Sequence, residues 1–128
     1  MKEEQQTERV YLRVRTKQFA LRVIRAVETL PRGRAANVIG NQLLRSGTSV
    51  AANYRAACRA KSPADFVSKM GTVEEEADEA MFWMELLLES GLSNTGEINE
   101  LMREADQLVA ITVASINTAR RNIRPKRI

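Results

Sequence analysis

Hydrophobic residues recur every three or four positions over most of the chain, which is the spacing of one buried face of an α-helix. Start and stop signals divide this pattern into four helical segments, over residues 16–30, 34–59, 63–89 and 94–120. Thr16 is the predicted N-cap of the first segment, and Pro31 and Gly33 end it. Residues 1–15 give no clean helical pattern, so we expect either an N-terminal arm or an early start of the first helix.

The third segment carries the clearest boundary signals. Ser62 is followed by a proline at the first helical position, and Asp65 places a carboxylate in the first turn, where it meets the helix dipole. Gly91 can adopt the left-handed conformation that ends a helix. The fourth segment is predicted to begin near Asn94, with Glu97 as the partner residue of a capping box.

Four helices with short connections favour an all-α fold, an antiparallel up-down-up-down four-helix bundle over residues 16–120, followed by a basic tail over 121–128. A chain of 128 residues is long enough to bury one core. Small residues through 46–52 indicate that another helix approaches the second one closely. The polar N-terminus and the lack of an 18-residue apolar run predict a cytoplasmic protein with no membrane association.

The third and fourth segments carry more hydrophobic residues than one core face needs. A second apolar face is typical of a partner surface, so we expect a homo-oligomer; the alternative is a core wide enough to take these residues in. The candidate interface residues are Phe82, Trp83, Leu86, Met102, Val109, Val113 and Ile116.

Charge is distributed unevenly along the chain. Residues 1–63 hold 13 basic and 4 acidic side chains, a balance of +9, whereas residues 64–119 hold 2 basic and 12 acidic ones, a balance of −10. This asymmetry indicates either a basic surface for nucleic acid or basic helices neutralised by acidic neighbours, and we favour the second interpretation for most of the charges. The candidate phosphate-contacting residues are Arg15, Arg22, Arg25, Arg45, Arg55, Arg59, Lys61, Arg120, Arg121, Arg124, Lys126 and Arg127. The last five form either a basic arm or a solubilising terminus.

Nothing in the sequence predicts an enzyme, a metal site or a cofactor. Histidine is absent, and with it the commonest general base and transition-metal ligand. The carboxylates of Glu74–Glu79 are expected to be solvated or paired with arginines, although oxygen-only binding of Mg²⁺ or Ca²⁺ is a second option. Cys58 has no catalytic base to activate it, and no glycine-rich phosphate loop is present.

The segment RSGTSVAANYRAACRAKSPADF resembles the signature of the four-helix bundle proteins encoded within bacterial 23S rRNA intervening sequences. The matching positions are Arg45, Ser49, Val50, Asn53, Asp65 and Phe66. The family's Glu-Gly pair falls on Ala56 and Ala57, which puts any role of that glutamate in doubt. Related proteins include the accessory variability determinant of diversity-generating retroelements, a basic pentameric bundle that joins a reverse transcriptase and nucleic acid. The resemblance therefore implies a ring-like homo-oligomer, with a pentamer as one option.

Two functions follow from these observations. The first is a non-catalytic accessory protein that binds RNA or DNA phosphates through its first two helices and its tail. The alternative is a protein-protein interaction or assembly module that does not contact nucleic acid and docks a protein encoded nearby, such as a reverse transcriptase.

Overall fold

The computed structural model describes residues 2–123 and contains four α-helices and no strand in that range. The helices are α1 (Lys2–Glu28), α2 (Arg34–Ala57), α3 (Pro63–Glu89) and α4 (Gly96–Ile123). The prediction of an all-α, four-helix fold is confirmed. Three of the predicted tail residues, Arg124, Lys126 and Arg127, lie outside the described residues.

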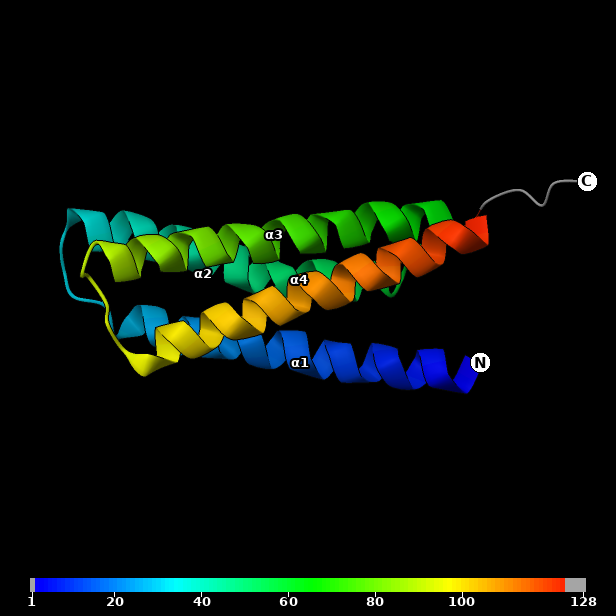
Figure 1. Ribbon diagram of the computed structural model, residues 1–128, viewed down its shortest axis with the longest axis horizontal. Coiled ribbons are helices and arrows are strands. Elements are labelled where there is room, and N and C mark those ends of the chain that lie inside the picture. The colour runs from blue at the N-terminus through cyan, green and yellow to red at the C-terminus, as the bar shows by residue number, and fades with distance from the viewer. Residues whose placement is uncertain (1, 124–128) are drawn as a thin grey trace, which may run out of the picture.

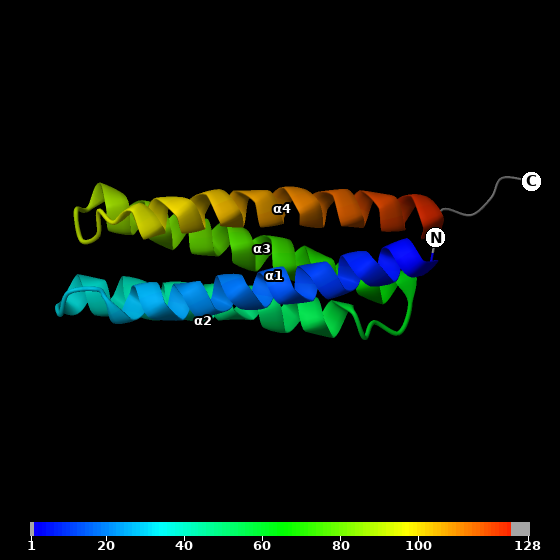
Figure 2. The same ribbon diagram turned by 90° about the horizontal axis from the view of Figure 1, so that it is seen from below.

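The chain reverses direction at each of its three connections, so that helices adjacent in sequence run side by side (Figure 1). The start of α1 and the end of α4 lie at the same end of the molecule, together with the connection between α2 and α3 (Figures 1 and 2). We call this the open end. The opposite end, which holds the α1–α2 and α3–α4 connections, is the closed end. α1 and α4 contact each other far less than the other neighbouring pairs.

Helix boundaries follow local chemistry at most positions. The hydroxyl of Ser62 accepts a hydrogen bond from the backbone N–H of Asp65 at 3.0 Å, which confirms the predicted N-cap of α3. Gly91 has φ 77°, the left-handed conformation expected where α3 ends. Neither of these signals depends on another helix.

One predicted helix start and one predicted capping box are wrong. Thr16 is not an N-cap, because α1 begins at Lys2; the Thr16 side chain is buried and its hydroxyl donates to the carbonyl of Leu12 at 2.8 Å. α4 begins at Gly96 instead of Asn94. Glu97 is therefore the second helical residue, one position too early for a capping box, and its carboxylate accepts a hydrogen bond from Arg22.

A single core runs through the bundle and takes side chains from all four helices. Its largest fully buried members are Phe19, Leu43, Met70, Met84, Leu87, Ile98, Leu101 and Leu108. Gly47 allows a close helix approach: a Cβ atom at this position would lie 2.8 Å from the Cγ1 of Val23. The predicted close packing near residues 46–52 is therefore confirmed, and α1 is the approaching helix.

α1 is apolar on two opposite sides. Leu12, Phe19 and Val23 face the core. An outer strip of Val10, Val14, Leu21 and Ile24 recurs at helical spacing on the other side of the helix. Three strip members are large exposed hydrophobic residues, Val14 being 56% exposed. The surplus apolar surface predicted for the last two helices thus lies mainly on the first.

Candidate functional site at the open end of the bundle

Three of the predicted phosphate-contacting arginines are occupied by carboxylates of neighbouring helices. The Arg15 guanidinium donates to both carboxylate oxygens of Glu104 on α4, each at 2.7 Å, and to Gln107. Both side chains of this ion pair are less than one-fifth exposed. The hydrogen bond to Glu104 raises the pKa of Arg15 above its ordinary value, although partial burial opposes the shift.

Arg22 and Arg45 are held in the same way. Arg22 Nε lies 2.9 Å from the carboxylate of Glu97, and this contact raises the pKa of Arg22. Arg45 of α2 pairs with Glu76 at 3.1 Å and also with Glu79, both on α3. The interpretation of basic helices neutralised by acidic neighbours holds for these three arginines, and within the acidic run Glu76 and Glu79 serve as the partners of Arg45.

Five other predicted cations remain exposed and form no ion pair within residues 2–123. They are Arg55, Arg59, Lys61, Arg120 and Arg121. All five lie at the open end, because α2 and α4 both finish there (Figure 2). Arg25 is also exposed, but it lies near the closed end in the last turn of α1.

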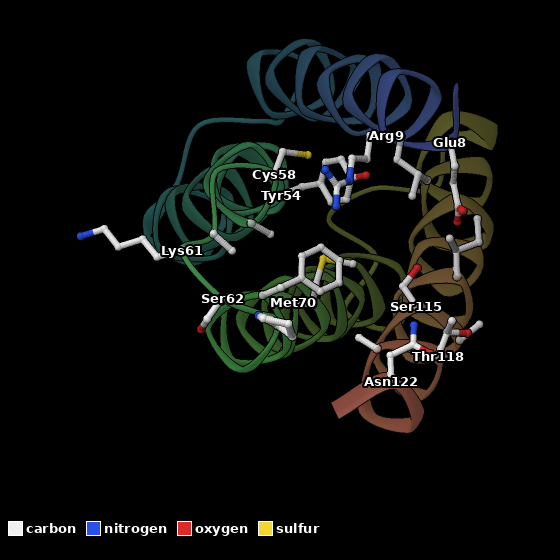
Figure 3. A pocket seen from close by; sticks show the side chains of 18 residues that line it. Glu8, Arg9, Tyr54, Cys58, Lys61, Ser62, Met70, Ser115, Thr118 and Asn122 are labelled. Atoms are coloured by element: carbon white, nitrogen blue, oxygen red, sulfur yellow. The ribbon is translucent and has the colours of Figure 1, made fainter. Parts of the chain in front are cut away.

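A cavity of about 740 Å³ lies among the four helices at the open end (Figure 3). Its wall is largely apolar and includes Leu12, Phe66, Met70 and Ile111. The cavity lies between Arg15 and the open end. Of the α1 residues that form ion pairs with α4, Arg15 is the one nearest to that end. Because its residues come from all four helices, no local sequence pattern could have identified it.

Tyr54 of α2 and Cys58, the residue that follows the last residue of α2, line this cavity one helical turn apart. Tyr54 is almost fully buried. This burial is the main cause that raises the pKa of its hydroxyl above the ordinary value, and the neighbouring Cys58 is the second. The hydroxyl therefore keeps its proton at neutral pH and can donate a hydrogen bond. Cys58 is a half-buried free thiol in the same wall.

The predicted interface residues do not form one exposed surface. Phe82 is 48% exposed and packs edge to face against the half-buried Trp83, with ring centroids 5.0 Å apart. Ile116 is only 6% exposed and belongs to the bundle's own core. The others are half-buried: Leu86, Met102, Val109 and Val113.

The residues of the family-like motif pack and form hydrogen bonds within α2, α3 and the connection between them. Val50 is fully buried, and the Asn53 amide donates to the carbonyl of Ser49 at 2.8 Å. Asp65 accepts a hydrogen bond from the Lys61 backbone N–H and pairs with the side chain of Lys69, and these two contacts lower its pKa. Phe66 lines the cavity, and so does Ala57, where the family has glycine. The motif therefore builds the α2–α3 hairpin and one side of the cavity.

None of the helices in residues 2–123 combines the length and apolar character needed to cross a membrane. A search of curated proteins finds no match. Among solved structures, a protein of unknown function from the S23 ribosomal protein family of Bacteroides thetaiotaomicron is 28% identical. The match has a TM-score of 0.73 and covers 81% of this chain and 96% of that one. The family model described as 23S rRNA-intervening sequence protein matches residues 10–114. The chain therefore belongs to the 23S rRNA-intervening sequence protein family.

Proposed function

We propose that this protein is a non-catalytic, cytoplasmic accessory protein that binds RNA or DNA phosphates through the open end of its bundle. One observation carries the proposal: the exposed cations left without a carboxylate partner in residues 2–123 include five at this end, whereas Arg15, Arg22 and Arg45 are neutralised elsewhere. Phosphate contact requires accessible cations and no particular base chemistry, so the expected binding is sequence-independent.

The test is a titration of single-stranded RNA and of duplex DNA, followed by fluorescence anisotropy at several salt concentrations. The triple variant Arg55→Gln, Arg59→Gln, Lys61→Gln should bind RNA more weakly. Its log–log salt slope should be smaller by about 2 if each of the three neutralises one phosphate. The matched control is Arg25→Gln, Arg32→Gln, Arg34→Gln, three exposed cations near the closed end. Equal losses in the two variants, or no binding at low salt, would contradict the proposal.

The proposed working unit is a homo-oligomeric ring of antiparallel up-down-up-down bundles. The outer strip of α1 is apolar and has the exposed cations Arg13, Lys17 and Arg25 beside it. On α3, the exposed ring of Phe82 is surrounded by carboxylates at helical spacing, namely Glu75, Asp78, Glu85 and Glu89. The two surfaces are complementary in charge and differ from each other, so contact between copies would be head-to-tail, the type of contact from which closed rings are built.

Two single substitutions test this assembly. Val14→Glu and Phe82→Glu each place a charge in one of the two surfaces and should each give monomers in light scattering coupled to size exclusion. Mixed together, the variants should form a 1:1 dimer, because each retains the surface that the other lacks. An absence of dimers in the mixture would exclude this head-to-tail contact.

The second candidate function, a protein-protein assembly module without direct nucleic-acid binding, is favoured by the same apolar outer strip of α1. It predicts that the native protein copurifies with a specific protein in a complex that survives nuclease treatment. Loss of that complex on nuclease treatment would favour the first function instead.

A further inference from the structure

The open-end cavity has the size and lining of a small-molecule site. Its volume of about 740 Å³ falls within the roughly 300–1,000 Å³ typical of ligand pockets. The wall of Leu12, Phe66, Met70 and Ile111 suits an alkyl chain, which gains from leaving water in proportion to the apolar area buried.

The mouth of the cavity supplies groups that recognise an anion. Figure 3 shows Arg9 reaching from α1 toward the cavity, whereas Lys61 points away from it. Arg9 forms no ion pair within the part of the chain that the structure describes. The Tyr54 hydroxyl is a protonated donor in the wall. Glu8, also on α1, is the acidic residue of the lining and lies on the side of the cavity next to α4 (Figure 3). The cations of the open end add a favourable field for a negative ligand.

We propose that this cavity binds a fatty acid of medium to long chain length. Its alkyl chain lies among the four helices, and its carboxylate lies at the mouth, where it accepts hydrogen bonds from Arg9 and Tyr54. Charge-assisted hydrogen bonds of this kind are about twice as strong as neutral ones, which gives the site its preference for an acid over an alcohol. The proposal does not depend on nucleic-acid binding or on assembly.

Cys58 provides a direct measurement, because it is the chain's only cysteine and it lines the cavity. The rate of its alkylation by iodoacetamide is measured on the full chain with saturated fatty acids of 8 to 16 carbons, below their micelle concentrations. Bound acid should slow alkylation, and the longer chains should protect at lower concentrations. The alcohol of equal chain length should protect about tenfold to a hundredfold less well, the cost of losing hydrogen bonds to a charged group.

A pair of exposed arginines on α1 provides the matched control. Arg9→Gln should reduce affinity for the acid about tenfold or more and leave affinity for the alcohol unchanged. Arg13→Gln, one turn further on and absent from the lining, should change neither. Ser115→Leu adds bulk at the α4 wall and should weaken acid and alcohol alike, with circular dichroism to verify the helical fold.

Three results would overturn the proposal. One is an alkylation rate unaffected by any of the acids, and another is equal protection by acid and alcohol in the native protein. The third is protection of Cys58 that grows with protein concentration in the absence of added acid, since this would mean that a second copy fills the cavity.

Discussion

The two ends of the bundle are built from the same four helices but differ in how charge is used. Toward the closed end, Arg15 and Arg22 of α1 are bound by carboxylates of α4, which tie together the two helices with the fewest contacts. At the open end α1 and α4 are instead separated by the cavity, and exposed cations such as Arg59 lack a carboxylate partner in residues 2–123. Ion pairs therefore join the first and last helices toward the closed end, whereas none of the ion pairs in residues 2–123 joins them at the open end.

This difference also teaches how the charge asymmetry of the sequence should be interpreted. Neutralisation between helices explains the charges of Arg15, Arg22 and Arg45, whereas the open end has a basic surface. An arginine facing an acidic helix stabilises the fold and is a poor candidate for phosphate contact. Exposed cations beyond the reach of α3 and α4 carboxylates are the better candidates.

The largest expected effect on the free energy of unfolding comes from comparing a residue of the close-packed core with a residue of the cavity wall. Leu101→Ala removes a fully buried side chain from the first turns of α4 and should lower the free energy of unfolding by about 2–5 kcal/mol. Ile111→Ala, in the wall of the cavity, should cost at most about 1.5 kcal/mol, because that side chain already lacks neighbours on one side. Urea denaturation measures both, and equal losses would mean that the open end is as tightly packed as the closed end.

A second experiment removes one ion pair between α1 and α4. Arg15→Gln leaves the mostly buried carboxylate of Glu104 without its cation and should reduce the free energy of unfolding by about 1–2 kcal/mol. The comparison is Arg55→Gln at the open end, which should stay within about 0.5 kcal/mol of the native protein. Should Arg55→Gln prove the more damaging, the assignment of paired and free cations would be wrong.

Two glycines test how closely the helices approach. Gly47→Ala should be destabilising by about 1 kcal/mol, because the new Cβ would overlap buried Val23 and the overlap outweighs the gain in helix propensity. Gly71→Ala on α3 has no atom within 4 Å of the new Cβ and should be stabilising by up to about 1 kcal/mol. Thermal unfolding of the two variants should shift in opposite directions, and a shift in the same direction would refute the predicted overlap.

The smallest effect concerns pH at the start of α3. The contacts with Lys69 and with the Lys61 backbone N–H lower the pKa of Asp65 in the folded state, so its contribution is present above the unfolded pKa of about 3.9. That contribution disappears as pH falls through the folded pKa. Asp65→Asn should therefore be less stable than the native protein at pH 7, and the difference should vanish at strongly acidic pH. NMR titration should also find a higher pKa for Asp65 in Lys69→Gln than in the native protein.

Local signals in the sequence predicted three of the four helices closely. The Ser62 cap and the left-handed Gly91 depend only on nearby backbone, and both are found as expected. Thr16 failed as a cap because the same side chain can cap a helix or bond back to the carbonyl four residues earlier. The extra apolar face was assigned to α3 and α4, but the large exposed hydrophobic residues lie mainly on α1, whose first 15 residues gave no clean helical pattern.

The sequence by itself determined three of the four helices closely, and the family, because these depend on residues close together in the chain. Only the tertiary structure decided which cations are neutralised and where the cavity lies. Arg15 and Glu104 are 89 positions apart, and the cavity takes residues from all four helices. Charge pairing falls off over a few ångströms, so its pattern is decided by which helices become neighbours, and that is a property of the packed bundle.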